Sequence, residues 1–255
     1  MANSIYNSAR KLFSHGLIDW SGYGVPAPAN WSATTYAVGD KVTNSSTHNV
    51  YMVVAQTGAS AAAPTHTTAT DTVVDNVTWR YLGMDMSSYQ IWAALVNTSA
   101  TGGGTGMQVY SNPSNSSDST LFVAGTSGSR NMWTEFGLGQ ASIANTSLIR
   151  SGALGATDNI LAQLTGRTMI TTTQACDAAD ITFTAVPDTG NFGTNIEGIV
   201  IYAKNTAGWA DATNVGSDYP VLLFIDTLAS AAALSIDPNG GDIVVQWNSS
   251  GIVRL

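Results

Sequence analysis

Short apolar runs separated by polar turns dominate the chain and restrict its fold more than any other feature of the sequence. Some runs alternate apolar and polar residues, and others are continuously apolar and rich in Val, Ile and aromatic residues; both kinds are typical of β-strands. The strongest are residues 89–96 (YQIWAALV), 180–186 (DITFTAV), 195–203 (NIEGIVIYA), 219–226 (YPVLLFID), 241–247 (GDIVVQW) and 251–255 (GIVRL). Residues 248–250 predict a hairpin between the last two. The pattern predicts a mainly β protein, an antiparallel β-sandwich or barrel, and not a parallel α/β sheet.

The N-terminal segment is the exception and predicts one helix. Its apolar residues fall at the helical positions i, i+4, i+7 and i+8: Ile5, Ala9, Leu12 and Phe13. Asn3 or Ser4 is suited to cap the start of this helix, and Gly16 is suited to end it.

Residues 26–84 predict a second, smaller unit inside the first. The segment begins with a Pro-Ala-Pro sequence typical of a linker, and it contains three predicted strands at residues 35–43, 49–56 and 77–82. So short a unit buries little area, so its aromatic residues must supply much of its core. These are Trp31, Tyr36, Tyr51, Trp79 and Tyr81.

Charge is scarce in this chain. Charged residues make up 10% of it and the net charge is −8, whereas an ordinary soluble domain carries about 25% charged residues. Nine Lys and Arg are too few for the basic patch that nucleic acid or an anionic membrane requires. No apolar run approaches a membrane span, and no signal peptide is recognisable. The single cysteine, Cys176, excludes an intrachain disulfide and predicts a small buried residue.

Two resemblances follow from these segments. The Trp-Ser-Ala-Thr-Thr-Tyr-Ala-Val-Gly-Asp-Lys-Val sequence at 31–42, followed by residues 50–51, Pro64 and residues 79–83, resembles the three-stranded carbohydrate-binding module of the chitin-binding family 5/12 type. The segments 5–20, 164–168, 180–186, 195–202, 224–227 and 238–247 resemble a family of uncharacterised tailed-bacteriophage virion proteins. The second resemblance implies that residues 89–96 follow Asp19 and Trp20 in space. The main β domain then comprises residues 1–25 and 85–255, and the module of residues 26–84 is inserted into it.

No catalytic or metal-binding pattern is present, so we expect no enzyme activity, cofactor or metal. The Gly-Thr-Ser-Gly-Ser sequence at 125–129 lacks the spacing of a nucleophile elbow. The glycines at 102–106 lack the Lys of a phosphate-binding loop and predict a flexible loop. His15, His48 and His66 have no ligand spacing and are expected at the surface. The pairs Asp71 with Asp75 and Asp211 with Asp218 are expected to be solvated and not to bind a cation.

The aromatic residues of the small unit are the only candidate site in the sequence. Sugar rings stack on exposed Trp and Tyr faces, so the candidate glycan-binding residues are Trp31, Tyr36, Tyr51, Trp79 and Tyr81. The competing interpretation, which we favour for any one of them, is that these side chains form the core of the unit. Trp79 and Tyr81 lie two residues apart on one strand, so they share a face.

The resemblances imply a structural component of a tailed-phage virion, most simply a capsid decoration or cement protein on the outer surface of the shell, synthesised in the host cytoplasm. The expected partners are the major capsid protein or other virion proteins, and further copies of this chain, with a trimer as one expected form. The alternative is a tail, baseplate or head-fibre adhesin that binds host-surface polysaccharide through the inserted module. A secreted chitin-active enzyme is a weaker third hypothesis, because neither a signal peptide nor a catalytic pair supports it.

Overall fold

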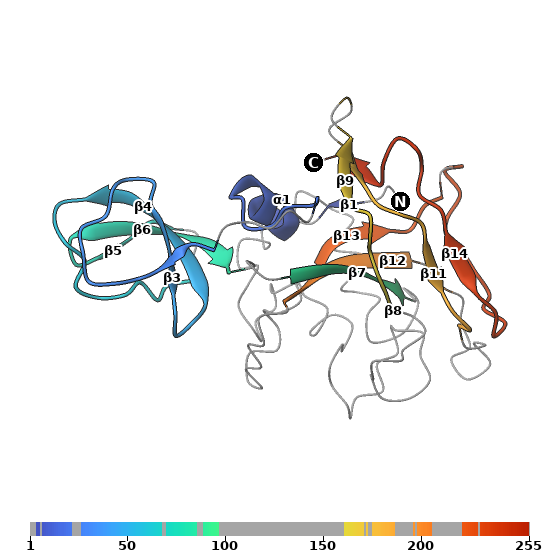
Figure 1. Ribbon diagram of the computed structural model, residues 1–255, viewed down its shortest axis with the longest axis horizontal. Coiled ribbons are helices and arrows are strands. Elements are labelled where there is room, and N and C mark those ends of the chain that lie inside the picture. The colour runs from blue at the N-terminus through green and yellow to red at the C-terminus, as the bar shows by residue number, and fades with distance from the viewer. Residues whose placement is uncertain are drawn as a thin grey trace.

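The computed structural model is a mainly β structure with one helix in its described part, which confirms the predicted fold class (Figure 1). The described residues are 4–5, 7–21, 27–67, 70–85, 89–96, 161–170, 172, 175–186, 196, 198–205, 221–228 and 230–254. The predicted flexible loop of the glycines at 102–106, the sequence at 125–129 and the pair Asp211 with Asp218 lie outside them.

A five-stranded antiparallel sheet forms the centre of the larger part of the molecule, which we call the body (residues 4–21 and 89–254 of the described chain). Its order is β1-β13-β12-β7-β8. The strands are β1 (Ser4–Ile5), β7 (Tyr89–Val96), β8 (Leu161–Gln163), β12 (Gly198–Asn205) and β13 (Val221–Ile225). Strands β7 and β12 pair along their full length and bury residues on both faces, because each contains a run of consecutive apolar residues.

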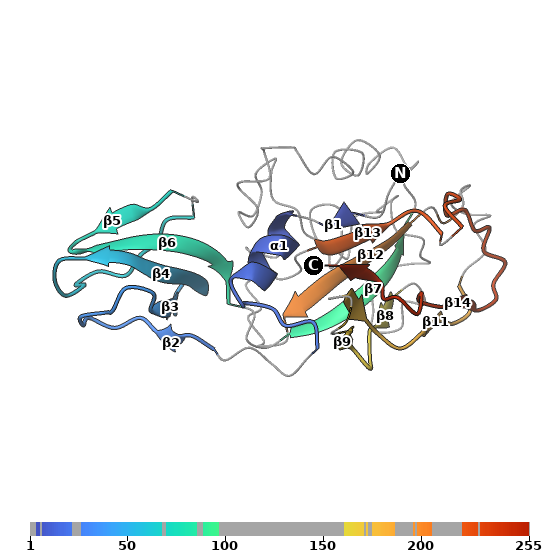
Figure 2. The same cartoon turned by 90° about the horizontal axis from the view of Figure 1, so that it is seen from above.

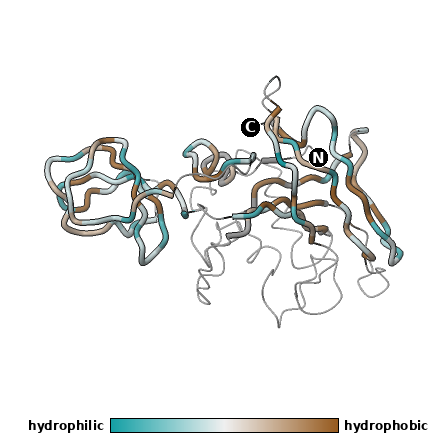
Figure 3. Tube along the Cα trace, viewed as in Figure 1, coloured by the Kyte–Doolittle hydropathy of each residue, from teal (hydrophilic) through white to brown (hydrophobic). Residues whose placement is uncertain are grey.

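Two smaller antiparallel sheets pack against the five-stranded sheet (Figures 1 and 2). One has the order β15-β10-β9 and the other pairs β11 with β14. Their strands are β9 (Thr168–Ile170), β10 (Ala175–Asp177), β11 (Ile181–Phe183), β14 (Ile243–Val245) and β15 (Val253–Arg254). Cys176 and Phe183, both fully buried, join residues of the large sheet in one hydrophobic core. Figure 3 shows that hydrophobic residues follow the strands of these packed sheets.

Helix α1 (Asn7–Ser14) covers part of this core. Ala9 and Leu12 are fully buried, as the spacing predicts. The helix ends at Gly16 with a positive φ of 62°, where Gly16 N–H donates to the carbonyl of Phe13 (3.0 Å) and Leu17 N–H donates to that of Leu12 (2.8 Å). This pair of bonds is a Schellman motif, which glycine favours.

A second five-stranded sheet, which we call the small sheet, lies to one side of the body (Figures 1 and 2). Its order is β2-β3-β4-β6-β5, and only β2 and β3 run parallel. The strands are β2 (Ala29–Asn30), β3 (Lys41–Asn44), β4 (Asn49–Gln56), β5 (Thr72–Val74) and β6 (Val77–Met84). Among the described residues its strands pair only with one another.

The chain leaves and re-enters the body at one place. The backbone N–H of Asp19 donates to the hydroxyl of Tyr89 (2.6 Å), and this hydroxyl also donates to the carbonyl of Asp19. Residue 89 therefore adjoins residue 19, the arrangement expected if the intervening segment is inserted. Val50 and Leu82 of the small sheet belong to the core of the body, so the two parts share a packed contact. The proposed boundaries at 26 and 84 stay a prediction.

Several local predictions were wrong. The predicted hairpin of residues 241–255 does not form, because β14 pairs with β11 and the following strand β15 pairs with β10. The small sheet has five strands and not three, since two short edge strands add to it. The helix begins at Asn7, after Ser4 and Ile5, which form β1, so Ser4 does not cap it and Ile5 is not on its apolar face, while Asn3 lies outside the described residues.

The predicted strand at residues 35–43 is strand only from Lys41 onward. Residues 37–40 form a turn in which the side chain of Asp40 accepts from the N–H of Ala37 (2.7 Å). Gly39 has a φ of 95°, a conformation that glycine adopts without strain. The Gly-Asp pair therefore specifies a turn at a position where the apolar alternation alone indicates a strand.

Candidate functional site

The aromatic residues of the small sheet come together, and most of their surface is buried. Tyr51 and Trp79 are fully buried, and Tyr36 is 9% exposed. Trp31 and Tyr81 are partly buried against the same cluster, so Trp79 and Tyr81 share a face as predicted. The rings of Tyr36 and Trp79 meet edge to face at 5.3 Å, and those of Tyr51 and Tyr81 are tilted at 5.7 Å. These contacts are typical of an aromatic core.

Hydrogen bonds hold several of these rings in place. The hydroxyl of Tyr36 donates to the carbonyl of Ser32 (2.6 Å) and accepts from its N–H (2.8 Å). Trp31 donates from its indole N–H to Ser60 Oγ (3.3 Å). By contrast, the indole N–H of Trp79 and the hydroxyl of Tyr81 are buried and have no hydrogen-bond partner among the described residues. Burial raises the pKa of Tyr81 far above its ordinary value.

The segment after β4, residues 57–67, packs over one side of this cluster through His66 and is called the loop below. The ring of His66 lies 5.2 Å from that of Tyr51, and the hydroxyl of Tyr51 donates to the carbonyl of His66 (2.9 Å). The imidazole nitrogens are buried, so burial lowers the pKa of His66, while the nearby Trp79 backbone and the charge of Asp71 act in the opposite direction. The prediction that His66 is a solvated surface residue is therefore wrong, because the loop turns its ring inward.

An ion pair joins Asp71, which directly precedes β5, to β6. Arg80 donates two hydrogen bonds to the carboxylate of Asp71, both at 2.7 Å, and this pairing lowers the pKa of Asp71. Asp75 accepts from the N–H of Ala61 (3.2 Å). Each carboxylate thus has a partner in the protein, and among the described residues no group of three or more His, Cys, Asp or Glu could hold a metal ion.

The burial of the cluster decides how the candidate glycan residues can act. A pyranose ring needs an accessible aromatic face, and Tyr36, Tyr51 and Trp79 offer none in this structure. Trp31 and Tyr81 keep partial exposure, but the hydroxyl of Tyr81 is covered. The structure thus brings the five predicted residues together as the core of the small sheet, the interpretation that we favoured for each of them.

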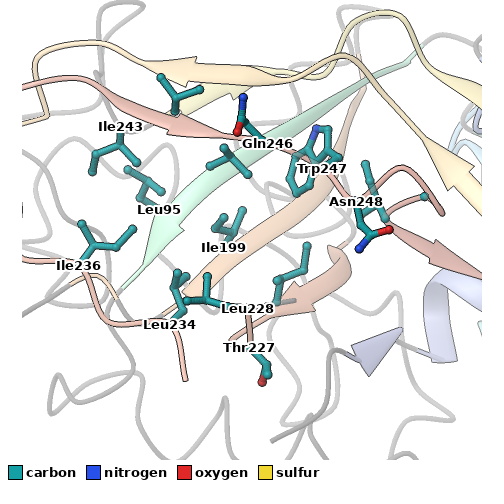
Figure 4. Close-up of a pocket in the computed structure, with 15 residues that line it drawn as sticks. Leu95, Ile199, Thr227, Leu228, Leu234, Ile236, Ile243, Gln246, Trp247 and Asn248 are labelled. Carbon is teal, nitrogen blue, oxygen red and sulfur yellow. The ribbon is translucent and has the colours of Figure 1, made fainter. Parts of the chain in front are cut away.

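A second feature, which was not predicted from the sequence, lies in the body. An apolar groove with a volume of about 400 Å³ opens between strand β14 and the segments at residues 227–228 and 234–236 (Figure 4). Leu95 and Ile199 of the large sheet form its floor, as Figure 4 shows. The half-buried Ile243 and Val245 line it on the side of β14.

The polar side chains among the described lining residues lie towards the rim of this groove. They are Thr227, Gln246 and Asn248, and none of the described lining residues is charged. Trp247 lies beside Gln246 and Asn248 (Figure 4). Its indole N–H donates to the carbonyl of Ala179 (3.0 Å), and its backbone N–H donates to the carboxylate of Asp180 (3.0 Å). Short strands separated by loops in the sequence form this surface jointly, which is why no single motif indicates it.

Three further side chains of the body, those of Cys176, Trp20 and Arg167, are placed by burial or by contacts with other parts of the body. Cys176 is fully buried, as predicted, and burial raises the pKa of its thiol to about 12. Trp20 is buried and donates from its indole N–H to the carbonyl of Asp177 (2.7 Å). The guanidinium of Arg167 lies 5.9 Å from the centre of the Tyr89 ring, a distance suited to a cation–π contact.

Comparisons with protein-family models, with curated proteins and with solved structures found no match to this chain. Within the described residues, no helix has the length and apolar character that a membrane-spanning helix requires.

Proposed function

We propose that this chain is a non-catalytic structural component of a tailed-bacteriophage virion, and that it decorates the outer capsid surface and stabilises the shell. The observation that carries the proposal is the two-part β architecture on a charge-poor chain. The β body carries an apolar groove whose described lining residues are uncharged, and a second sheet is held to one side of the body (Figures 1 and 4). Such a body is suited to binding a protein surface, because burying neutral polar groups costs less than burying charged ones.

The mechanism of stabilisation would be mass action. A protein that binds only the assembled shell lowers the free energy of that state and does not affect the free subunits. The partners would be the major capsid protein and further copies of this chain, with a trimer as one expected form. The low content of Lys and Arg favours the outer surface over one facing the packaged genome.

The adhesin alternative has weaker support. It would require the small sheet to bind host-surface polysaccharide through Trp31, Tyr36, Tyr51, Trp79 and Tyr81. Three of these are buried, so glycan stacking would need either the partly exposed Trp31 and Tyr81 alone or an opening of the loop at residues 57–67.

The deciding experiment is to measure the copy number of the chain in purified particles by quantitative mass spectrometry against the major capsid protein. A simple stoichiometric ratio to the capsid protein would support decoration, and particles lacking the chain should then lose stability to heat and low salt. A copy number far below that of the capsid protein, together with binding of the intact protein to a glycan array, would favour the adhesin. Absence of the chain from particles would reject both.

A further inference from the structure

Strand β14 presents a free edge to the groove. It pairs with β11 through Ile243, Val244 and Val245, and no other strand pairs with it among the described residues. In a two-stranded antiparallel sheet each strand directs half of its backbone N–H and C=O groups away from its partner. These groups can form a ladder with any extended chain that lies beside them.

The groove beside this edge has the lining that an added strand requires. Its floor is the apolar surface of Leu95 and Ile199, so a side chain that points inward from an extended segment would enter an aliphatic environment (Figure 4). Successive side chains of a strand point to opposite faces, so every second residue of the segment would contact the floor. Gln246 and Asn248 at the rim could bond the polar groups of such a segment.

The exposed rim argues for a polypeptide and against a small molecule. Leu228 is 48% exposed and Val244 is 58% exposed, and both border the groove. A small ligand buried in about 400 Å³ would leave these side chains in water, whereas a strand that crosses the rim would cover them. Exposed apolar side chains around a concave apolar surface commonly mark such contacts.

We propose that the groove binds an extended segment of a partner polypeptide, which pairs with the free edge of β14 and inserts aliphatic side chains at alternate positions. This is the β-augmentation mode of peptide recognition. Charge complementarity restricts the partner: none of the described residues that line the groove is charged, and a buried unpaired charge is costly, so the segment is uncharged. The inference goes beyond the proposed function and does not depend on the place of the chain in a particle.

The test uses the full-length protein and a short capped peptide in which Ile and Ser alternate. We expect the peptide to bind and to slow amide hydrogen exchange in Ile243–Val245. A peptide of the same sequence with methylated backbone nitrogens, which cannot pair with a strand edge, should bind at least about tenfold more weakly. The double variant Leu228→Glu with Val244→Glu should weaken binding of the first peptide by a similar factor, because it places charges at the rim.

The matched control is Val38→Glu with Val73→Glu. These valines lie outside the body and are 65% and 67% exposed. The control therefore adds the same charge at sites somewhat more exposed than Leu228 and Val244, and it should leave binding unchanged. Three results would overturn the proposal: no binding, equal binding of the methylated peptide, or binding of an apolar dye that the peptide fails to displace. Self-association that the rim variant abolishes would also overturn it, since the occupant would then be a second copy of this chain.

Discussion

The small sheet and the body cover their apolar surfaces to different extents. The small sheet encloses its aromatic cluster with its own loop, and Tyr51 and Trp79 have no exposed surface. The body leaves an aliphatic groove open beside β14, with Leu228 and Val244 at its rim. The difference indicates that the small sheet contains its own core, whereas this region of the body is suited to being covered by another chain.

The largest effect should come from opening the closed core. Trp79→Ala removes a fully buried indole and should lower the free energy of unfolding by about 3 to 5 kcal/mol, measured by urea denaturation monitored through circular dichroism. Trp31→Ala is the matched control and should cost clearly less, because Trp31 is only partly buried. Equal losses would show that the small sheet does not depend on a closed core, and the contrast with the body would fail.

A second prediction concerns how closely the C-terminal segment packs in the body. Gly251 has a φ of 94°, and a Cβ there would lie 2.7 Å from Ala175 Cβ and 2.8 Å from the carbonyl oxygen of Cys176. Gly251→Ala should destabilise the body by about 1 to 3 kcal/mol through this overlap, in addition to a backbone cost of about 1 to 2 kcal/mol.

Gly240→Ala is the matched control for this prediction. Gly240 also has a positive φ, of 84°, but an added Cβ would meet no atom within 4 Å. It should show the backbone cost alone, measured as the shift in thermal midpoint by calorimetry. If both variants shift the midpoint equally, the C-terminal segment is not packed against β10 as described.

Sequence reasoning was most accurate for the central strands. The predicted limits of residues 89–96 and 49–56 agree with β7 and β4, because long apolar or alternating runs leave few other structures open. It failed where pairing partners decide the structure: nothing within residues 241–255 shows that β14 pairs with β11 and β15 with β10. The ring of His66 turns inward because of a contact with Tyr51, and a Thr-rich loop sequence does not encode that contact. The groove was missed for the same reason, since four separate segments line it.

The third prediction is an effect of acid on the small sheet alone. The pKa of His66 is lowered, so the closed loop favours neutral histidine and the open loop binds more protons. The stability that His66 gives to the closed loop is complete above its ordinary pKa of about 6.5 and is lost as the pH falls from there through the lowered value. We expect amide exchange in residues 57–67 to accelerate on mild acidification, while β7 and β12 keep their protection.

Two variants test the assignment to this histidine. His66→Phe keeps a ring against Tyr51 but cannot take up a proton, so the mild-acid response should disappear. His15→Gln, in the body, should leave the response unchanged. A response that persists in His66→Phe would assign it to another group, and equal acceleration in β7 would show that the two regions do not differ in their sensitivity to acid.

The smallest effect should come from the ion pair between Asp71 and Arg80. Asp71 and Arg80 are both well exposed to solvent, and exposed pairs contribute little to stability. Asp71→Asn should therefore leave the thermal midpoint nearly unchanged at high salt, and differ from the parent protein only at low salt, where screening is weak. The control Asp75→Asn removes an exposed carboxylate that accepts from the N–H of Ala61 and has no described ion pair. A large loss of midpoint for Asp71→Asn at high salt would mean that this pair, and not the contact of His66 with Tyr51, holds the loop over the aromatic cluster.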